Sequence, residues 1–296
     1  MKRIVLVIPL FLIAISTLWG QANILNAKVP QEIGRKTPQQ IASDNSKPLP
    51  YPYVDDKDIL WSIEVWERID LDERFNLPLY YPVDSVSTTA DRRALFDVLL
   101  SGIKSGQIKE VYADSYFTEK LSPEDLNEVL YYVDTTDVGK EQFNYEGKVD
   151  EEYIRKLSIT PAEIEAYHIR GVWYFDSKYG ELRYRIIGIA PVAYDLAAQA
   201  NDLDAELVEL FWVFFPDARD VLHKYNAYNP RNAARPFNFD HLLNGRFFSA
   251  VIYKTSNVYG DRAIKEYIQE DALRQLLESN KIKQLILEME EDQWNY

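Results

Sequence analysis

The sequence holds few combinations of residue types that could carry out catalysis. Ser101-Gly-Ile-Lys104 matches S-x-x-K, a spacing in which a lysine can activate a serine hydroxyl as a nucleophile. Such a serine belongs at the start of a helix, whereas Ser101 directly precedes Gly102, where the predicted helix ends. Lys254-Thr-Ser256 resembles the K-T-G strand of the same enzymes, but no S-x-N lies between the two segments. We interpret S-x-x-K as a chance match.

The remaining titratable residues give no better candidate. The three histidines (His168, His223 and His241) are far apart, without metal-ligand spacing, and we expect structural roles for them. Glu151 and Glu152 lie in a polar stretch typical of a solvated surface. There is no G-x-S-x-G, P-loop, G-x-G-x-x-G, H-E-x-x-H or EF-hand loop, and no cysteine. We therefore predict no catalytic residue, no metal ligand and no cofactor.

Aromatic residues are the more informative feature. The chain contains six tryptophans and 21 tyrosines, and Trp61, Trp66, Tyr80 and Tyr81 cluster early in it. Packing in the core would explain such residues, but tyrosine and tryptophan are also typical anchors of protein interfaces. These four residues are our candidate interface positions.

Charge is segregated along the chain. Glu119 to Glu165 carries 13 acidic and five basic residues, whereas Asp217 to Arg246 carries five basic and three acidic residues, including Arg231 and Arg235. An acidic flank and a basic flank on one chain can meet head to tail, and such a contact closes into a ring when the rotation allows it. Arg231 and Arg235 are therefore candidates for self-association.

Composition limits the class of protein. The chain has 296 residues, is 47% hydrophobic and carries a formal net charge of −14, which excludes a disordered or multi-span membrane protein. Net acidity argues against a nucleic-acid partner, because phosphate binding needs clustered lysine and arginine. The absence of cysteine excludes disulfides, thiolate nucleophiles and a lipid-modified N-terminal cysteine.

The N-terminus has the layout of a secretory signal peptide. Lys2 and Arg3 precede an apolar run from Ile4 to Leu18, and small residues follow at Gly20 and Ala22. We predict a signal peptide over residues 1–20, with cleavage after Ala22 as the alternative. A membrane anchor is the other interpretation, although the apolar run is short for a span and contains a proline. Residues 21–54 hold five prolines and predict an extended arm.

From residue 55 the pattern predicts one α+β domain over 55–296, with short mixed strands and several helices. The strongest signals are an N-cap and proline at Ser122-Pro123, and a hairpin formed by 172–175 and 182–189. Further helices are expected at 58–69, from Asp91, at 160–167, 217–222 and 239–248, and as one or two amphipathic helices from Ile264 onward. Short strands are expected at 111–113, 211–215 and 249–253. Residues 134–158 lack an apolar stripe and predict a loop.

Longer motifs resemble one family. They are Asp58-Ile-Leu-Trp-Ser-Ile-Glu-Val-Trp-Glu-Arg-Ile-Asp-Leu71, Asn76-Leu-Pro-Leu-Tyr-Tyr-Pro82, Arg93-Ala-Leu-Phe96, Gly171-Val-Trp-Tyr-Phe-Asp176, Arg185-Ile-Ile-Gly-Ile-Ala-Pro191, Phe211-Trp-Val-Phe-Phe-Pro216, Asn229-Pro230, Arg246–Phe248 and Tyr253-Lys254. Together they resemble the GldN/PorN family, gliding-motility and type IX secretion components of the Bacteroidetes, over nearly all of residues 55–296.

The resemblance implies a periplasmic, non-enzymatic subunit. It implies an outer-membrane lipoprotein partner of the GldK/PorK type, assembly with it into a large ring, contact with an inner-membrane motor protein of the GldM/PorM type, and a role in protein secretion. Without a lipid of its own, the chain would associate with the outer membrane through its partner. The contrasting hypotheses are an envelope-remodelling hydrolase that uses paired carboxylates and a carbohydrate-binding module that stacks sugars on the aromatic hairpin.

Overall fold

The computed structural model describes residues 47–84, 92–200, 205–229, 237–269 and 271–294, together with Val29 and Ala42. The chain divides into two units, Met1–Ser46 and Lys47–Tyr296, and the fold below is that of the second unit. The predicted signal peptide and most of the predicted arm lie outside the described residues. Of that arm, residues 47–54 are described, and they contain neither helix nor strand.

The second unit combines helices and strands, so the predicted α+β class is confirmed. The described helices are α2 (Leu77–Tyr80), α3 (Leu95–Lys104), α4 (Pro123–Leu130), α5 (Asp137–Glu146), α6 (Leu196–Ala200), α7 (Phe215–Lys224), α8 (Phe239–Asn244), α9 (Ile264–Tyr267) and α10 (Ala272–Trp294). The described strands are β1 (Ile59–Asp70), β2 (Val111–Tyr112), β3 (Tyr131–Thr135), β4 (Ile154–Ser158), β5 (Ile164–Asp176), β6 (Glu181–Tyr194), β7 (Leu207–Glu209), β8 (Trp212–Phe214), β9 (Asn226–Ala227), β10 (Phe237–Asn238) and β11 (Val251–Thr255).

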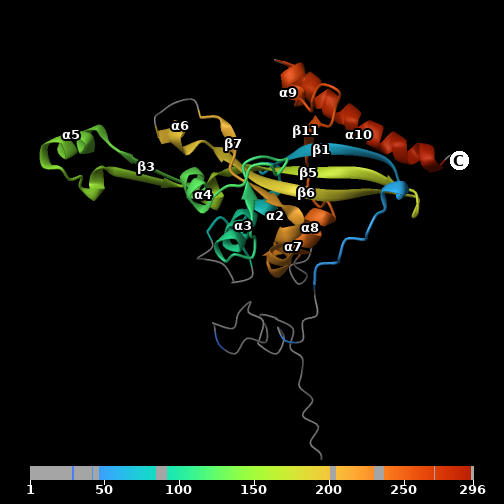
Figure 1. Ribbon diagram of the computed structural model, residues 1–296, viewed down its shortest axis with the longest axis horizontal. Helices are drawn as coiled ribbons and strands as arrows, with labels where there is room; N and C mark the ends of the chain where they lie inside the picture. The colour runs from blue at the N-terminus through green and yellow to red at the C-terminus, as the bar shows by residue number, and fades with distance from the viewer. Residues whose placement is uncertain are drawn as a thin grey trace, which may run out of the picture. The chain divides into compact units, whose positions relative to one another are not determined.

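One antiparallel sheet organises these elements. Its strand order is β11-β1-β5-β6-β8-β2, and β7 also pairs with β6. The long strands β1, β5 and β6 run side by side through its middle (Figure 1). The predicted hairpin is confirmed as β5–β6, which extends well beyond the expected residues at the end away from the turn. Its turn closes at Gly180, whose φ of 66° lies in the left-handed region that favours glycine.

The helix predicted over 58–69 is wrong, because these residues form β1. The apolar residues of this segment fit a helical spacing, but isoleucine, valine and tryptophan also favour strands. Residues Ile59 to Asp70 pair with β5, and Val65 to Arg68 pair with β11 on the other side. Hydrogen bonds to two neighbouring strands outweigh the local preference, and a central strand with two buried faces need not alternate strictly in polarity.

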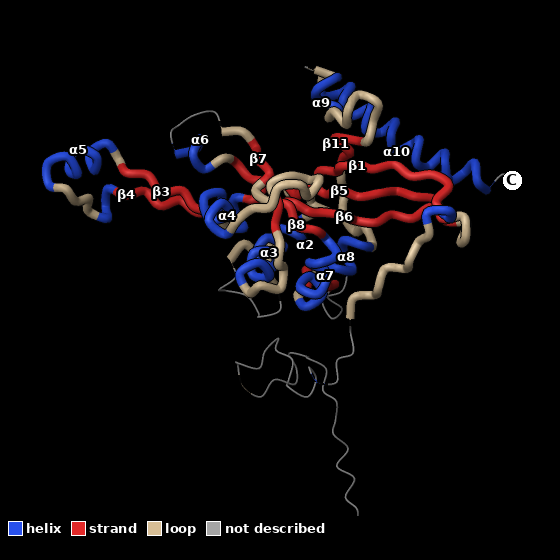
Figure 2. The backbone as a smooth tube through the Cα atoms, in the orientation of Figure 1, coloured by secondary structure: helices blue, strands red, loops and turns tan. Residues whose placement is uncertain are grey.

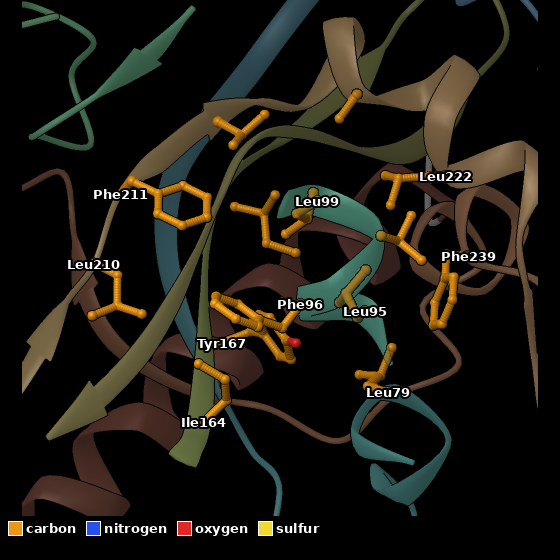
Figure 3. Packing of buried hydrophobic residues seen from close by; sticks show 14 of the residues in the cluster. Leu79, Leu95, Phe96, Leu99, Ile164, Tyr167, Leu210, Phe211, Leu222 and Phe239 are labelled. Carbon is orange, nitrogen blue, oxygen red and sulfur yellow. The ribbon is translucent and has the colours of Figure 1, made fainter. Parts of the chain in front are cut away.

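The main core lies on one face of the sheet. Side chains of α2, α3, α7 and α8 pack there against residues of β5 and β6. Figure 3 shows Phe96 and Leu99 of α3 beside Tyr167 of β5, with Phe211 on one side and Phe239 on the other. Because α3 buries Leu95, Phe96, Val98 and Leu99, the predicted helix after Asp91 is confirmed. The capped helix at Ser122 is confirmed as α4, with a capping box between Ser122 and Asp125.

Residues 131–158 form an extension that we call the hairpin arm, and the loop predicted over 134–158 is wrong. Strands β3 and β4 pair along their whole length and carry α5 at their far end, away from the large sheet (Figure 2). Thr136 caps α5, and Gly147 ends it in the left-handed conformation. Gly139 lets the helix approach the hairpin closely, since a Cβ there would lie 2.8 Å from the Cβ of Tyr153. Local pairing and caps hold the arm, so it needs no apolar stripe.

The other elements follow the predictions with altered limits. The helix predicted over 160–167 is wrong beyond a single turn at Pro161–Glu163, since β5 begins at Ile164. The predicted strands at 111–113, 211–215 and 249–253 are confirmed as β2, β8 and β11. The predicted helices at 217–222 and 239–248 appear as α7 and the shorter α8, and the C-terminal segment forms α9 and α10. In the part of the chain described, no helix combines the length and apolarity needed to cross a bilayer.

Candidate interaction surface

The structure separates the four aromatic candidates. Trp61 and Trp66 lie on β1 but five positions apart, so they point to opposite faces of the sheet. Trp66 is 1% exposed, and Trp61 is partly buried. The Tyr80 ring packs on the core and meets the Tyr81 ring edge-on at 4.8 Å. Of the four, Tyr81 is the most available to a partner, with 49% of its surface exposed.

The two basic candidates, Arg231 and Arg235, lie outside the described residues. Their proposed role in self-association therefore stays a prediction.

A buried ion pair joins the sheet to the segment after α8. Glu67 of β1 is 1% exposed and accepts two hydrogen bonds from Arg246, at 2.7 and 2.8 Å. The Tyr184 hydroxyl of β6 donates to the same carboxylate at 2.8 Å. Burial raises the pKa of Tyr184 well above its ordinary value, and the Glu67 charge raises it further, so the hydroxyl stays protonated. The Arg246 guanidinium also lies over the rings of Tyr184, Trp173 and Phe248. This cluster holds the segment between α8 and β11 against the sheet.

The face of the sheet opposite to Glu67 carries a cluster of cationic and aromatic side chains. The Arg170 guanidinium and the Lys254 ammonium both lie within 5.2 Å of the Trp66 ring centre and of the Tyr116 ring centre. Arg170 donates two hydrogen bonds to Glu64 and one to the Ser115 carbonyl. These contacts hold the 113–120 loop against the sheet. Trp66 therefore contributes to the packing of the fold.

A second polar network on this face centres on Glu209. Its carboxylate lies 2.6 Å from His168 Nδ1 and accepts hydrogen bonds from Trp212 Nε1 at 2.7 Å and from the Tyr253 hydroxyl at 3.3 Å. Burial alone would raise the pKa of Glu209, but the hydrogen bond and charge of His168, helped by Trp212 and Tyr253, outweigh burial and lower it. This network ties β7 to β5, β8 and β11.

We expect this network to make stability depend on acid pH. A carboxyl group whose pKa is lower in the folded state contributes stability above its unfolded pKa, near 4.5, and loses it as pH falls through the folded value. Urea unfolding from pH 6 to pH 3 should show a steeper loss of stability for the natural chain than for Glu209→Gln. Parallel pH curves for the two proteins would contradict the assignment.

The start of the second unit is anchored at Tyr51. Its ring lies between the guanidinium groups of Arg219 and Arg185, at 4.2 and 4.9 Å, and its hydroxyl donates to Asn244 at 2.7 Å. Arg219 is itself held by two hydrogen bonds to the buried carboxylate of Asp240. Residues 47–54 therefore lie against α7, α8 and the edge of β6. Their position is set by specific contacts.

The hairpin arm exposes large apolar side chains. Val138 and Tyr145 of α5 are seven positions apart, so they lie on one side of the helix, and they are 57% and 89% exposed. The exposed apolar residues of the arm are Tyr131, Val133, Val138, Phe143 and Tyr145. Among the described residues the arm's sheet has two strands, so each of β3 and β4 has one edge that pairs with no described strand. A projecting element with exposed rings and open strand edges is typical of a protein-binding surface.

The sequence pattern predicts a loop here because residues 134–158 lack the regular row of apolar residues that marks a helix or strand packed on a core. The available signals were the cap at Thr136, the glycine at the end of α5 and the tyrosine and valine residues before Asp134. None of the described residues forms a group of three or more histidine or carboxylate side chains that could hold a metal ion.

The comparisons with known proteins agree with the extent of this fold. A family model described as "Gliding motility associated protein GldN" matches residues 54–295, nearly all of the second unit. No match was found among curated proteins.

Proposed function

Because the chain belongs to the GldN family of gliding motility associated proteins, we propose that it is a non-enzymatic structural subunit of the type IX secretion and gliding machinery. In this proposal the exported chain works in the periplasm, at the inner side of the outer membrane. It assembles with a GldK/PorK-type lipoprotein into a large ring and contacts a GldM/PorM-type motor protein. The ring supports secretion of proteins across the outer membrane.

The observation that carries the proposal is the extent of the family match. It begins at residue 54, just before β1, and runs through α10, so it includes the complete sheet with its helices. A match to the whole folded unit supports a shared role better than a match to one motif would. A subunit that contacts several partners uses several surfaces of its fold, and these surfaces come from different parts of the chain. The coarse assignment to gliding motility follows directly from membership.

Within this function we assign the hairpin arm as a contact surface for another subunit. Its exposed rings and aliphatic side chains are available to a partner, and burying such side chains is worth about 1.5–3 kcal/mol each. In a ring, many contacts of this size act together, so moderate affinity at each one suffices.

The test uses cells that contain a variant as their sole copy of the chain. Val138→Asp with Tyr145→Asp should reduce co-purification of the lipoprotein at least tenfold. It should also abolish secretion of the proteins that the machinery exports, which carry C-terminal sorting signals. Burying two carboxylates at a contact costs several kcal/mol, whereas both positions are exposed in the free chain. Val258→Asp with Tyr53→Asp is the matched control, since these residues are 92% and 89% exposed and lie outside the arm.

Two outcomes separate the proposals. Normal secretion by cells that lack the chain altogether would overturn the function. Normal secretion by the Val138→Asp, Tyr145→Asp variant, in cells where deletion of the chain stops secretion, would overturn the arm as a contact surface and leave the function in place.

A further inference from the structure

Helix α10 uses one side to pack on the sheet. Ser279 Oγ accepts a hydrogen bond from the Ile252 amide at 3.1 Å, and Lys283 Nζ donates to the Ala250 carbonyl at 2.6 Å. Ile286 is buried with Val65 of β1 and Ile252 of β11. In Figure 1 the helix runs obliquely past β11 and β1, and the contacts with these strands come from residues 279–286. These residues define the inner side of α10.

The outer side of α10 carries exposed leucines. Leu273, Leu276, Leu277 and Leu287 are between 45% and 67% exposed, and Asn280 lies exposed among them. Positions 273, 280 and 287 are seven residues apart, and 276 and 277 fall on the same side between the first two. This is the spacing of a helix that packs along a second helix. A row of leucines over about 21 Å is more apolar surface than a single helix ordinarily leaves in water.

We propose that α10 pairs with α10 of a second copy of this chain, in antiparallel orientation, with Asn280 opposite Asn280. This pairing does not depend on the proposed function. The two-fold axis passes between the two Asn280 side chains, where each amide can both donate and accept a hydrogen bond. A polar residue midway between Leu273 and Leu287 favours one register of the paired helices, because a shift buries the amide without a partner.

Two of the exposed leucines, Leu273 and Leu287, are symmetric about Asn280, whereas Gln284 and Lys283 hold the positions that mirror Leu276 and Leu277. Leu273 and Leu287 lie seven residues before and seven residues after it, so in an antiparallel pair each Leu273 meets Leu287 of the other copy. A contact with a two-fold axis requires such a match, because the same patch must serve both sides.

Charge favours the antiparallel over the parallel arrangement. The last turns of α10 carry four carboxylates between Glu288 and Asp292, whereas its cations, Arg274, Lys281 and Lys283, all lie further toward the N-terminus. In a parallel pair the two acidic ends would lie together and repel. In the antiparallel pair the acidic ends are separated, and each lies near the N-terminal turn of the other copy, where Asp271 is the one described carboxylate and is paired with Arg274.

The chain contains no cysteine, so single cysteines can report the register directly. The full purified chain is oxidised mildly, and disulfide-linked dimers are measured on a non-reducing gel. Asn280→Cys should form at least ten times more dimer than Lys281→Cys, a matched control on the exposed flank of the same helix. Leu273→Cys and Leu287→Cys should each give little dimer alone and a strong heterodimer when mixed.

Three results would overturn the pairing. Equal dimer yields from Asn280→Cys and Lys281→Cys would mean that α10 does not meet itself at this register. Self-linking of Leu273→Cys as strong as its linking to Leu287→Cys would mean a parallel pair. The third is a molar mass, by light scattering, that is the same for the natural chain and for Leu273→Glu with Leu287→Glu. We expect that variant to have half the natural mass and an unchanged circular dichroism spectrum, since both leucines lie outside the core.

Discussion

Arg246→Ala is expected to destabilise the fold by about 3 kcal/mol, because it leaves the Glu67 carboxylate buried without its cation. Arg246 supplies both charged hydrogen bonds to Glu67, and Tyr184 alone would remain as a donor. The same change removes the planar group that lies over three aromatic rings. Urea unfolding followed by tryptophan fluorescence measures the loss, which should appear as a lower midpoint with an unchanged slope.

The controls separate charge burial from the loss of any ion pair. Lys120 and Glu110 lie 2.6 Å apart, a separation similar to the 2.7 Å between Arg246 and Glu67, but both side chains are exposed. Lys120→Ala should therefore leave the urea midpoint nearly unchanged, because solvent screens an exposed pair. Arg246 also has a φ of 52°, so Arg246→Gly relieves backbone strain and should cost less than Arg246→Ala. Equal effects of Arg246→Ala and Lys120→Ala would contradict the assigned role.

Gly171→Val is expected to cost about 2 kcal/mol, although valine is the better strand former. The Tyr184 ring lies directly over Gly171, and an added Cβ would overlap its ring and hydroxyl. The tyrosine would have to move, which would also break its hydrogen bond to Glu67. Urea unfolding again measures the effect.

A double-mutant cycle tests the cause. In a Tyr184→Ala background nothing occupies the space over Gly171, so the cost of Gly171→Val should fall by at least half. The cost of Gly171→Val staying the same in both backgrounds would mean that backbone conformation, and not the ring, excludes a side chain at this position.

Local patterns in the sequence predicted the elements whose interactions are local. Ser122 and Pro123 begin α4 because a hydroxyl cap and a missing amide suit that position wherever the helix lies in the fold. The β5–β6 hairpin followed from alternation around a short turn, and the leucines of α10 followed from their spacing. The long tryptophan- and proline-rich motifs identified the family, and the family match confirms it.

Tertiary pairing decided the rest. Residues 59–70 satisfy a helical spacing, and they form β1 because β5 and β11, both far later in the chain, supply hydrogen bonds on both sides. The spacing of apolar residues contains no information on such partners. The hairpin arm was missed for the opposite reason, since its helix and strands leave several apolar residues exposed and so lack the stripe that burial imposes.

The candidate surfaces divide in the same way. The sequence by itself determined that this chain is rich in aromatic residues, has no cysteine and carries an amphipathic C-terminal helix. Only the tertiary structure decided that Trp66 is interior, that Glu67 is a buried carboxylate matched by Arg246, and that Tyr145 and the outer leucines of α10 face solvent. Exposure depends on what packs above a residue, and residues distant in the chain supply that packing.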